Sequence, residues 1–155
     1  MKRKVRPARR EDLPRLHEIE RGCFPGPEQL TRGQLSALAF RVDVAPLVVE
    51  LDGRAVGFAL VHFHGDAARL LTIDVDEAAR GTGCGRALLD AAEDAAREAG
   101  CASIGLEVRV GNAGAIALYE KAGYARLRRV RDYYPDESGN PEDALEMAKS
   151  IHRPQ

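Results

Sequence analysis

The segment Arg80-Gly81-Thr82-Gly83-Cys84-Gly85-Arg86 follows a strand-like run that ends near Val75 and opens an Ala/Leu-rich run from Cys84 to Ala99. A glycine loop at the start of a helix leaves several backbone N–H groups without intrahelical acceptors, where the helix dipole is positive. Glycines also let a ligand approach the backbone closely, and the two arginines can add charge-assisted contacts. The loop therefore predicts a phosphate or pyrophosphate site, with a ligand-free glycine turn as the alternative.

Two common phosphate-binding motifs do not fit this loop. The dinucleotide fingerprint G-x-G-x-x-G lacks its third glycine, whether it is counted from Gly81 or from Gly83. The nucleoside-triphosphate loop ends in Gly-Lys followed by Ser or Thr, and the segment contains no lysine.

The rest of the chain predicts one mixed α/β domain over residues 1–155, in the order β-α-α-β-β-β-α-β-α-β-β. Alternating and periodic apolar residues predict strands at 5–8, 47–51, 55–64, 69–75, 103–110, 124–134 and 144–151, and helices at 12–22, 28–40, 84–99 and 113–122. Asp12 is the expected cap of the first helix, and Asp52-Gly53 is a two-residue hairpin signal. The third helix should pack through one stripe of small and apolar residues: Ala87, Leu88, Ala91, Ala92, Ala95 and Ala99.

Composition excludes several classes of protein. The 155 residues carry 23 basic and 24 acidic side chains, a formal charge of -1, which argues against a general nucleic-acid binder. No apolar run approaches the ~20 residues of a membrane helix, and the basic start lacks the apolar core of a signal peptide. Three cysteines without a C-x-x-C pair predict neither a disulfide framework nor a structural zinc site, so a reducing cytoplasm is expected.

Two further residue patterns are candidate sites. His62 and His64 form an H-x-H pair on one strand face, but no acid or cysteine at ligand spacing completes a metal site, so no metal is expected. Cys84 lies at a helix N-terminus, which can lower a thiol pKa, yet a small packing residue is the simpler interpretation.

The loop and its surroundings resemble the GNAT superfamily of N-acetyltransferases, whose acetyl-CoA loop reads [QR]-x-x-G-x-[GA]. Residues 70–147 look closest to the ribosomal-protein alanine N-acetyltransferase branch. The resemblance is carried by Ile73-Asp74-Val75, Leu106-Glu107-Val108-Arg109, 112–120, Gly123-Tyr124, Arg131-x-Tyr133-Tyr134-Pro135 and Glu142-Asp143-Ala144-x-x-Met147.

The resemblance implies a mixed, mostly antiparallel sheet that splays open at its centre, flanked by helices, with acetyl-CoA in the gap. The pantetheine arm would bind backbone groups of Ile73 and Val75, and the pyrophosphate would bind the loop amides. The residues implied in cofactor binding are Ile73, Asp74, Val75, Arg80, Gly81, Thr82, Gly83, Cys84, Gly85, Arg86 and Asn112.

Acetyl transfer to an amine needs a base for the amine, a donor for the oxyanion and an acid for the departing thiolate. Glu107 is the candidate base, because burial in an apolar strand would raise its pKa; the alternative is a structural salt bridge, for example with Arg109. The resemblance implies that Tyr119 is the acid, whereas its helix neighbourhood alone would assign it to core packing, and the Val75 N–H is the candidate oxyanion donor.

The acceptor is the least determined part of the sequence. The resemblance makes Phe24, Tyr133 and Tyr134 candidates for the acceptor groove, and the alternative for the two tyrosines is that they are ordinary strand aromatics. The loop Phe24-Pro25-Gly26-Pro27-Glu28 lacks the tryptophan usual in this branch. The leading hypothesis is acetylation of a protein N-terminal α-amine, possibly that of a ribosomal protein, by a monomer or weak homodimer in the cytoplasm. A small amine such as an amino acid, polyamine or drug is the first rival. A CoA-binding module without catalysis is the second, and the presence of Glu107 and Tyr119 weighs against it.

Charge is unevenly distributed along the chain. A basic cluster at Arg126, Arg128, Arg129 and Arg131 precedes an acidic stretch from Asp132 to Glu146. We hypothesise that the acidic stretch helps to attract a basic peptide acceptor.

Overall fold

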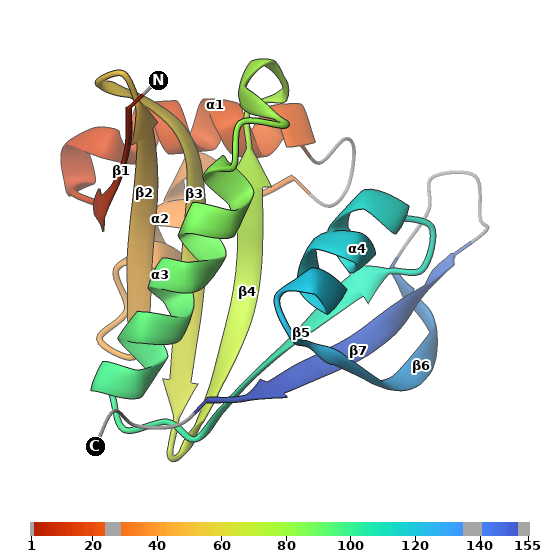
Figure 1. Cartoon of the computed structure of the whole chain (residues 1–155). Coiled ribbons are helices and arrows are strands. Elements are labelled where there is room, and N and C mark those ends of the chain that lie inside the picture. The colour runs from red at the N-terminus through yellow and green to blue at the C-terminus, as the bar shows by residue number, and fades with distance from the viewer. Residues whose placement is uncertain (1, 24–28, 135–140, 152–155) are drawn as a thin grey trace.

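Seven strands form one sheet in the order β1-β2-β3-β4-β5-β7-β6 (Figure 1). The structure, a computed structural model, describes residues 2–23, 29–134 and 141–151. The strands are β1 Arg3–Pro7, β2 Val44–Leu51, β3 Arg54–His64, β4 Ala67–Val75, β5 Ser103–Arg109, β6 Ala125–Tyr134 and β7 Glu142–Ser150. The helices are α1 Leu13–Cys23, α2 Arg32–Ala39, α3 Cys84–Glu98 and α4 Ala113–Lys121, with 3-10 turns at Arg10–Asp12 and Glu77–Ala79. The expected order of strands and helices is confirmed.

The sheet has two halves that separate at its centre. Strands β1 to β4 pair antiparallel, as do β5, β7 and β6. Within the described residues, strand pairing joins the halves only where β4 and β5 pair in parallel, over Ala67–Arg69 and Ser103–Gly105. Beyond those three residue pairs β4 and β5 diverge, as Figure 1 shows, so the expected splay is present. Strands β4 and β5 therefore each have one edge that faces the gap between the two halves.

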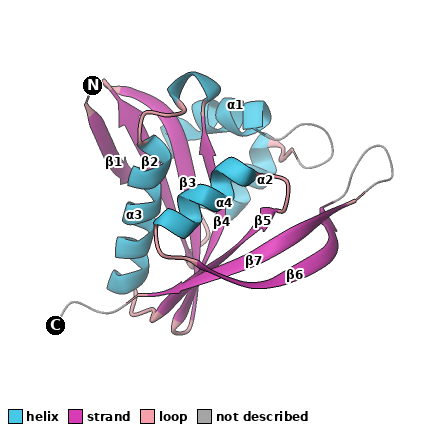
Figure 2. Ribbon diagram, turned by 45° about the vertical axis from the view of Figure 1, so that its right-hand side comes forward, coloured by secondary structure: helices cyan, strands magenta, loops and turns pink. Residues whose placement is uncertain are grey.

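Helices cover both faces of the sheet. Helix α3 packs on one face of the β1–β4 half, and α4 covers the β5–β7 half (Figure 2). Helices α1 and α2 pack on the opposite face around Leu16, Leu35 and Phe58, each fully buried. No helix in the described ranges is long and apolar enough to cross a membrane.

Three local predictions need correction. Asp12 does not cap α1: it closes the preceding 3-10 turn, accepting from the Arg9 N–H at 2.7 Å, and its carboxylate pairs with Arg6 of β1. Helix α2 begins at Arg32 because Thr31 caps it, its hydroxyl accepting from the Gln34 N–H at 3.0 Å. Strand β2 begins at Val44, three residues earlier than expected, because its pairing with β3 continues to His62.

The buried stripe of α3 is also displaced from the predicted one. Leu88 and Ala92 are buried as expected, but Ala99 is exposed, and the remaining buried positions are Cys84, Leu89, Glu93 and Ala96. The apolar pattern could not indicate that a charged residue, Glu93, lies on the buried face of α3. Glu93 is tolerated there because its carboxylate is paired with Lys149 and Tyr124.

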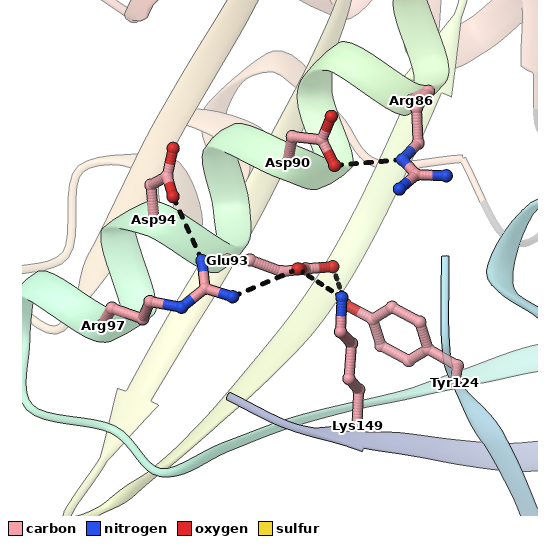
Figure 3. A network of polar contacts seen from close by, with 7 residues as sticks. All are labelled: Arg86, Asp90, Glu93, Asp94, Arg97, Tyr124 and Lys149. Atoms are coloured by element: carbon pink, nitrogen blue, oxygen red, sulfur yellow. Dashed lines mark hydrogen bonds and ion pairs between the residues drawn. The ribbon is translucent and has the colours of Figure 1, made fainter. Parts of the chain in front are cut away.

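The Glu93 network joins the two halves of the molecule (Figure 3). Lys149 of β7 donates to Glu93 Oε1 at 2.8 Å, and the Tyr124 hydroxyl donates to Oε2 at 3.1 Å. Arg97 lies 3.7 Å from the same carboxylate. These contacts tie α3 to β7 and to the start of β6.

Candidate active site

The glycine loop leads directly into α3. Gly81 and Gly83 have φ angles of 77° and 84°, in the left-handed region, and Gly83 is the N-cap residue. Because no side chain caps α3, its first backbone N–H groups remain available for a ligand. This geometry fits the pyrophosphate of acetyl-CoA, since a helix N-terminus without a side-chain cap is a suitable anion site.

An arginine from the start of the chain also contacts this loop. Arg3 of β1 donates to the Thr82 carbonyl oxygen at 2.6 Å. A Cβ atom at Gly83 would come within 3.1 Å of the same guanidinium. Arg3 could not be assigned to this loop from the sequence, where its one signal is the basic composition of residues 1–10.

The side chains of the loop have other partners. Cys84 is 1% exposed, and the Thr82 hydroxyl donates to the Ala79 carbonyl oxygen and lies 3.2 Å from Cys84 Sγ. Arg86 pairs with Asp90 at 3.0 Å on the exposed side of α3 (Figure 3). Arg80 approaches Cys23 Sγ at 4.0 Å.

The open edge of β4 presents backbone groups to the gap. The Asp76 N–H donates to Val56 of β3, so strand alternation directs the N–H groups of Val75 and Ile73 away from β3. The Cys23 thiol lies on this side too, donating to the Val75 carbonyl oxygen at 3.5 Å. An extended pantetheine arm could therefore pair with this edge as an additional strand would.

Asp74 lies between Ile73 and Val75 in β4, but its side chain points toward α1. It is 1% exposed and accepts from the Thr72 hydroxyl at 2.6 Å. Burial, opposed by this hydrogen bond and reinforced by nearby Glu20, raises the pKa of Asp74 to about 7. The Asp74 carboxyl therefore faces the α1 side of the sheet rather than the phosphate loop.

Glu107 occupies the opposite edge of the gap. Ile104, Leu106 and Val108 of β5 are buried under α3 and α4, so Glu107 points to the other face, as the alternation predicts. Its carboxylate pairs with Arg69 of β4 rather than with Arg109, which pairs with Glu142. Glu107 also lines an open pocket of about 350 Å³ together with His62, His64, Arg69 and Glu146.

Tyr119 of α4 lies near Asp74 of β4 and Tyr134 of β6. It is 5% exposed, and burial, with additional contributions from Asp74 and Tyr134, raises the pKa of its phenol. The hydroxyl therefore keeps its proton at neutral pH, as a general acid must before it acts.

A bulge in β6 directs two tyrosines toward the gap. The register shifts between Val130 and Tyr134, and Asp132 has a φ angle of 53°. The Tyr133 hydroxyl lies 3.3 Å from Arg69, and the Arg109 guanidinium lies 4.3 Å from the centre of the Tyr134 ring. Burial raises the pKa of Tyr134 to about 12, with Tyr133 and Glu107 adding to the shift. Tyr134 thus lies near both Glu107 and Tyr119.

This arrangement was compared with known proteins. Residues 13–124 match the Acetyltransferase (GNAT) family. The chain is a GNAT N-acetyltransferase. It is 42% identical over 142 residues to the [ribosomal protein bS18]-alanine N-acetyltransferase of Escherichia coli strain K12, covering 90% of this chain and 92% of that one. It is 32% identical to the putative enzyme of the same name from Bacillus subtilis strain 168, covering 96% and 95%.

A solved structure supports the same assignment. The crystal structure of the ribosomal-protein-S18-alanine N-acetyltransferase from Escherichia coli superposes with a TM-score of 0.88 at 30% identity, covering 99% of this chain and 97% of that one. The predicted fold class, the GNAT fold, is confirmed, and the enzyme is an acetyl-CoA-dependent N-acetyltransferase.

Other residues named from the sequence have the following surroundings in the structure. The Asn112 carboxamide oxygen caps α4, accepting from the Ala115 N–H at 3.1 Å. His62 lies 2.8 Å from an Asp43 carboxylate oxygen, a contact the sequence spacing did not indicate. No cluster of three or more potential metal ligands occurs in the described parts of the chain. Phe24 lies outside the described residues.

The basic cluster and the acidic stretch of the sequence form ion pairs with each other in the structure. The basic cluster and the acidic stretch lie on the paired strands β6 and β7, where Arg128 contacts Glu146 and Arg129 contacts Asp143, each at 2.5 Å. Charges that are separate in sequence therefore neutralise one another in space. Of the hypothesised acceptor-attracting acids, Asp136 and Glu137 lie outside the described residues.

Proposed function

We propose that the acetyltransferase modifies the N-terminal α-amine of a protein, of the ribosomal-protein alanine type. The observation that carries this proposal is the 42% identity to a [ribosomal protein bS18]-alanine N-acetyltransferase over 90% of the chain. The exposed pocket beside Glu107, and Tyr133 with 44% of its surface exposed, provide a surface on which an extended peptide could lie.

In the proposed mechanism Glu107 accepts a proton from the acceptor amine. An α-ammonium group has a pKa of about 8, so a nearby carboxylate, directly or through water, can complete its deprotonation. Arg69 holds the Glu107 carboxylate toward β4. Both residues line the pocket on that side of the sheet.

The other proposed roles belong to Val75 and Tyr119. Acetyl-CoA supplies the thioester carbon that the amine attacks. The Val75 N–H, directed into the gap, donates a hydrogen bond where negative charge develops on the carbonyl oxygen. Tyr119, kept neutral by burial, donates its proton to the departing sulfur. The Ile73–Val75 edge, the loop 80–86 and Asn112 hold the donor in this proposal.

The remaining parts of the proposal concern the setting of the enzyme. A cytoplasmic location agrees with Cys23, Cys84 and Cys101 being free thiols. We propose a monomer or weak homodimer that needs no metal or nucleic acid.

A substrate panel tests the acceptor. Peptides beginning with alanine, the same peptides blocked at the N-terminus, and small amines including spermidine would be compared by release of free CoA thiol. We expect turnover of the free peptides and none of the blocked ones. Brisk turnover of small amines with no turnover of free peptides would refute the proposal.

A further inference from the structure

Two buried carboxyl groups lie close together between α1 and β4, beside the gap. Glu20 of α1 is 3% exposed and Asp74 of β4 is 1% exposed. Their surroundings are apolar: Ile19 is buried in the same turn as Glu20, and Phe58, fully buried, pairs with Asp74 across the β3–β4 ladder. Glu20 is near enough to act on Asp74 electrostatically.

Each carboxyl group has one oxygen with a partner and one without. Glu20 Oε1 accepts from the Leu30 N–H at 3.1 Å, and Asp74 Oδ1 accepts from the Thr72 hydroxyl at 2.6 Å. Glu20 Oε2 and Asp74 Oδ2 are buried and have no hydrogen-bond partner in the described part of the chain. Unpartnered buried polar atoms are rare and costly, and two neighbouring carboxylates would also repel each other.

The other groups near Glu20 and Asp74 do not compensate the negative charge that two carboxylates would carry. The Cys23 thiol is neutral, because burial and the nearby Asp74 raise its pKa, and the Tyr119 phenol is neutral for the same two reasons. Arg80 contacts the Cys23 sulfur at 4.0 Å, and within the described residues it forms no ion pair with either carboxyl group. A proton is the ligand that satisfies two buried oxygens without needing any additional volume.

We infer that Glu20 and Asp74 form a carboxyl–carboxylate pair that holds one proton, using the two oxygens that have no other partner. The proton converts two acceptors into a donor and an acceptor. Carboxyl groups that share a site in this way are known to retain one proton well above the usual range.

The position of the pair gives it a structural consequence for the acetyltransferase. Glu20 also holds the Leu30 N–H, while His17 Nε2 lies 3.0 Å from the Leu30 carbonyl oxygen. On the same helix, Cys23 contacts the carbonyl oxygen of Val75. The shared proton therefore fixes the end of α1 and the chain at Leu30 against the end of β4. We assign Glu20 and Asp74 as positioning residues; this role rests on the proposed function of Val75, whereas the shared proton does not.

The sign of the pH dependence follows from the folded and unfolded states. Asp74 titrates near pH 4 when unfolded and at about 7 when folded, so the native state binds the proton more tightly. Native stability therefore falls as pH rises from about 4 to about 7 and is level above that range. Each pH unit within this window changes the unfolding equilibrium up to about tenfold, or roughly 100-fold between pH 5 and pH 8.

Carbon-13 NMR titration of the full-length protein tests the proton directly. We expect the Asp74 carboxyl carbon to titrate near pH 7 in the wild type and at a lower pH in Glu20→Gln. An Asp74 titration midpoint below pH 5 in the wild type, or the same midpoint in the wild type and in Glu20→Gln, would overturn the inference.

Urea unfolding between pH 5 and pH 8 provides the second test, with Asp94→Asn on the exposed side of α3 as the matched control. Asp74→Asn keeps a neutral group that can donate to Glu20, so it should lose the roughly 100-fold dependence that the wild type and control show. Asp74→Ala cannot donate and should be less stable than Asp74→Asn at pH 5. Equal pH dependence in Asp74→Asn and the control would overturn the inference.

Kinetics then test the positioning role separately. From pH 6 to pH 8, kcat should change differently in Asp74→Asn and the wild type, because only the wild type loses the proton and Val75 acts in the transition state. An identical kcat profile, with the NMR result intact, would refute positioning but leave the shared proton. Absence of any peptide turnover in the wild type would instead reject the proposed acceptor.

Discussion

Replacement of Lys149 by methionine should expose how strongly the Glu93 network joins the two halves of the sheet. Methionine keeps much of the lysine stem, but the Glu93 carboxylate, with its side chain 4% exposed, loses its 2.8 Å partner. Removing one member of a buried ion pair typically costs about 3–5 kcal/mol. We expect about 3 kcal/mol, the lower end, because Arg97 at 3.7 Å and the Tyr124 hydroxyl remain.

The measurement is thermal and urea unfolding, with a double-mutant cycle. A loss of about 3 kcal/mol lowers the Tm of a protein of this size by roughly 6–12 °C. Adding Glu93→Gln removes the stranded charge but keeps an oxygen for Tyr124, so the double variant should be more stable than Lys149→Met alone. Lys4→Met, at an exposed position of β1, is the matched control and should stay within about 0.5 kcal/mol of the wild type. A loss under about 1 kcal/mol for Lys149→Met, or no recovery in the double variant, would refute this reasoning.

Three further predictions concern the site and the packing beneath it. Glu107→Gln and Tyr119→Phe should each lower kcat by about 10²–10⁴-fold with little change in the Kd of acetyl-CoA; normal kcat in both would remove them from the mechanism. Gly83→Ala forces a φ of 84° on a residue with a Cβ and crowds Arg3, so it should cost about 1–2 kcal/mol and raise the Kd of CoA, as calorimetry would show. Gly57→Ala places a Cβ 2.8 Å from the Asp74 carbonyl oxygen and 3.3 Å from a buried Leu88 methyl, so it should cost about 1–3 kcal/mol in urea unfolding. For both glycine variants the control is Gly22→Ala, whose Cβ meets nothing within 4 Å and which should be neutral or stabilising.

The sequence predicts those parts of the fold that depend on local periodicity and turns. Asp52-Gly53 forms the expected hairpin turn, with φ angles of 51° and 87°. The alternation of β5 correctly assigns Ile104, Leu106 and Val108 to the core and Glu107 to the opposite face. These features require only the geometry of a single strand or turn.

Features that depend on distant partners could not be predicted in this way. Glu93 breaks the apolar stripe of α3 because its partners are 31 and 56 residues away. Arg69 pairs with Glu107 from a different strand, whereas sequence proximity suggested Arg109. Arg3 contacts the glycine loop from the first strand, 79 residues from Thr82. In each case the tertiary fold, rather than local spacing, determines the pairing.

The three-residue contact between β4 and β5 has a consequence for the energetics of unfolding. Few backbone hydrogen bonds connect the two halves, so the amides of β5, β6 and β7 should exchange with solvent through openings that leave β1–β4 intact. A ligand lying along both edges of the gap adds a connection between the halves. By mass action, acetyl-CoA at 100 times its Kd contributes about 2.7 kcal/mol to the state that binds it. Hydrogen exchange across the sheet should then become more uniform, and the two-part protein should unfold as one cooperative unit.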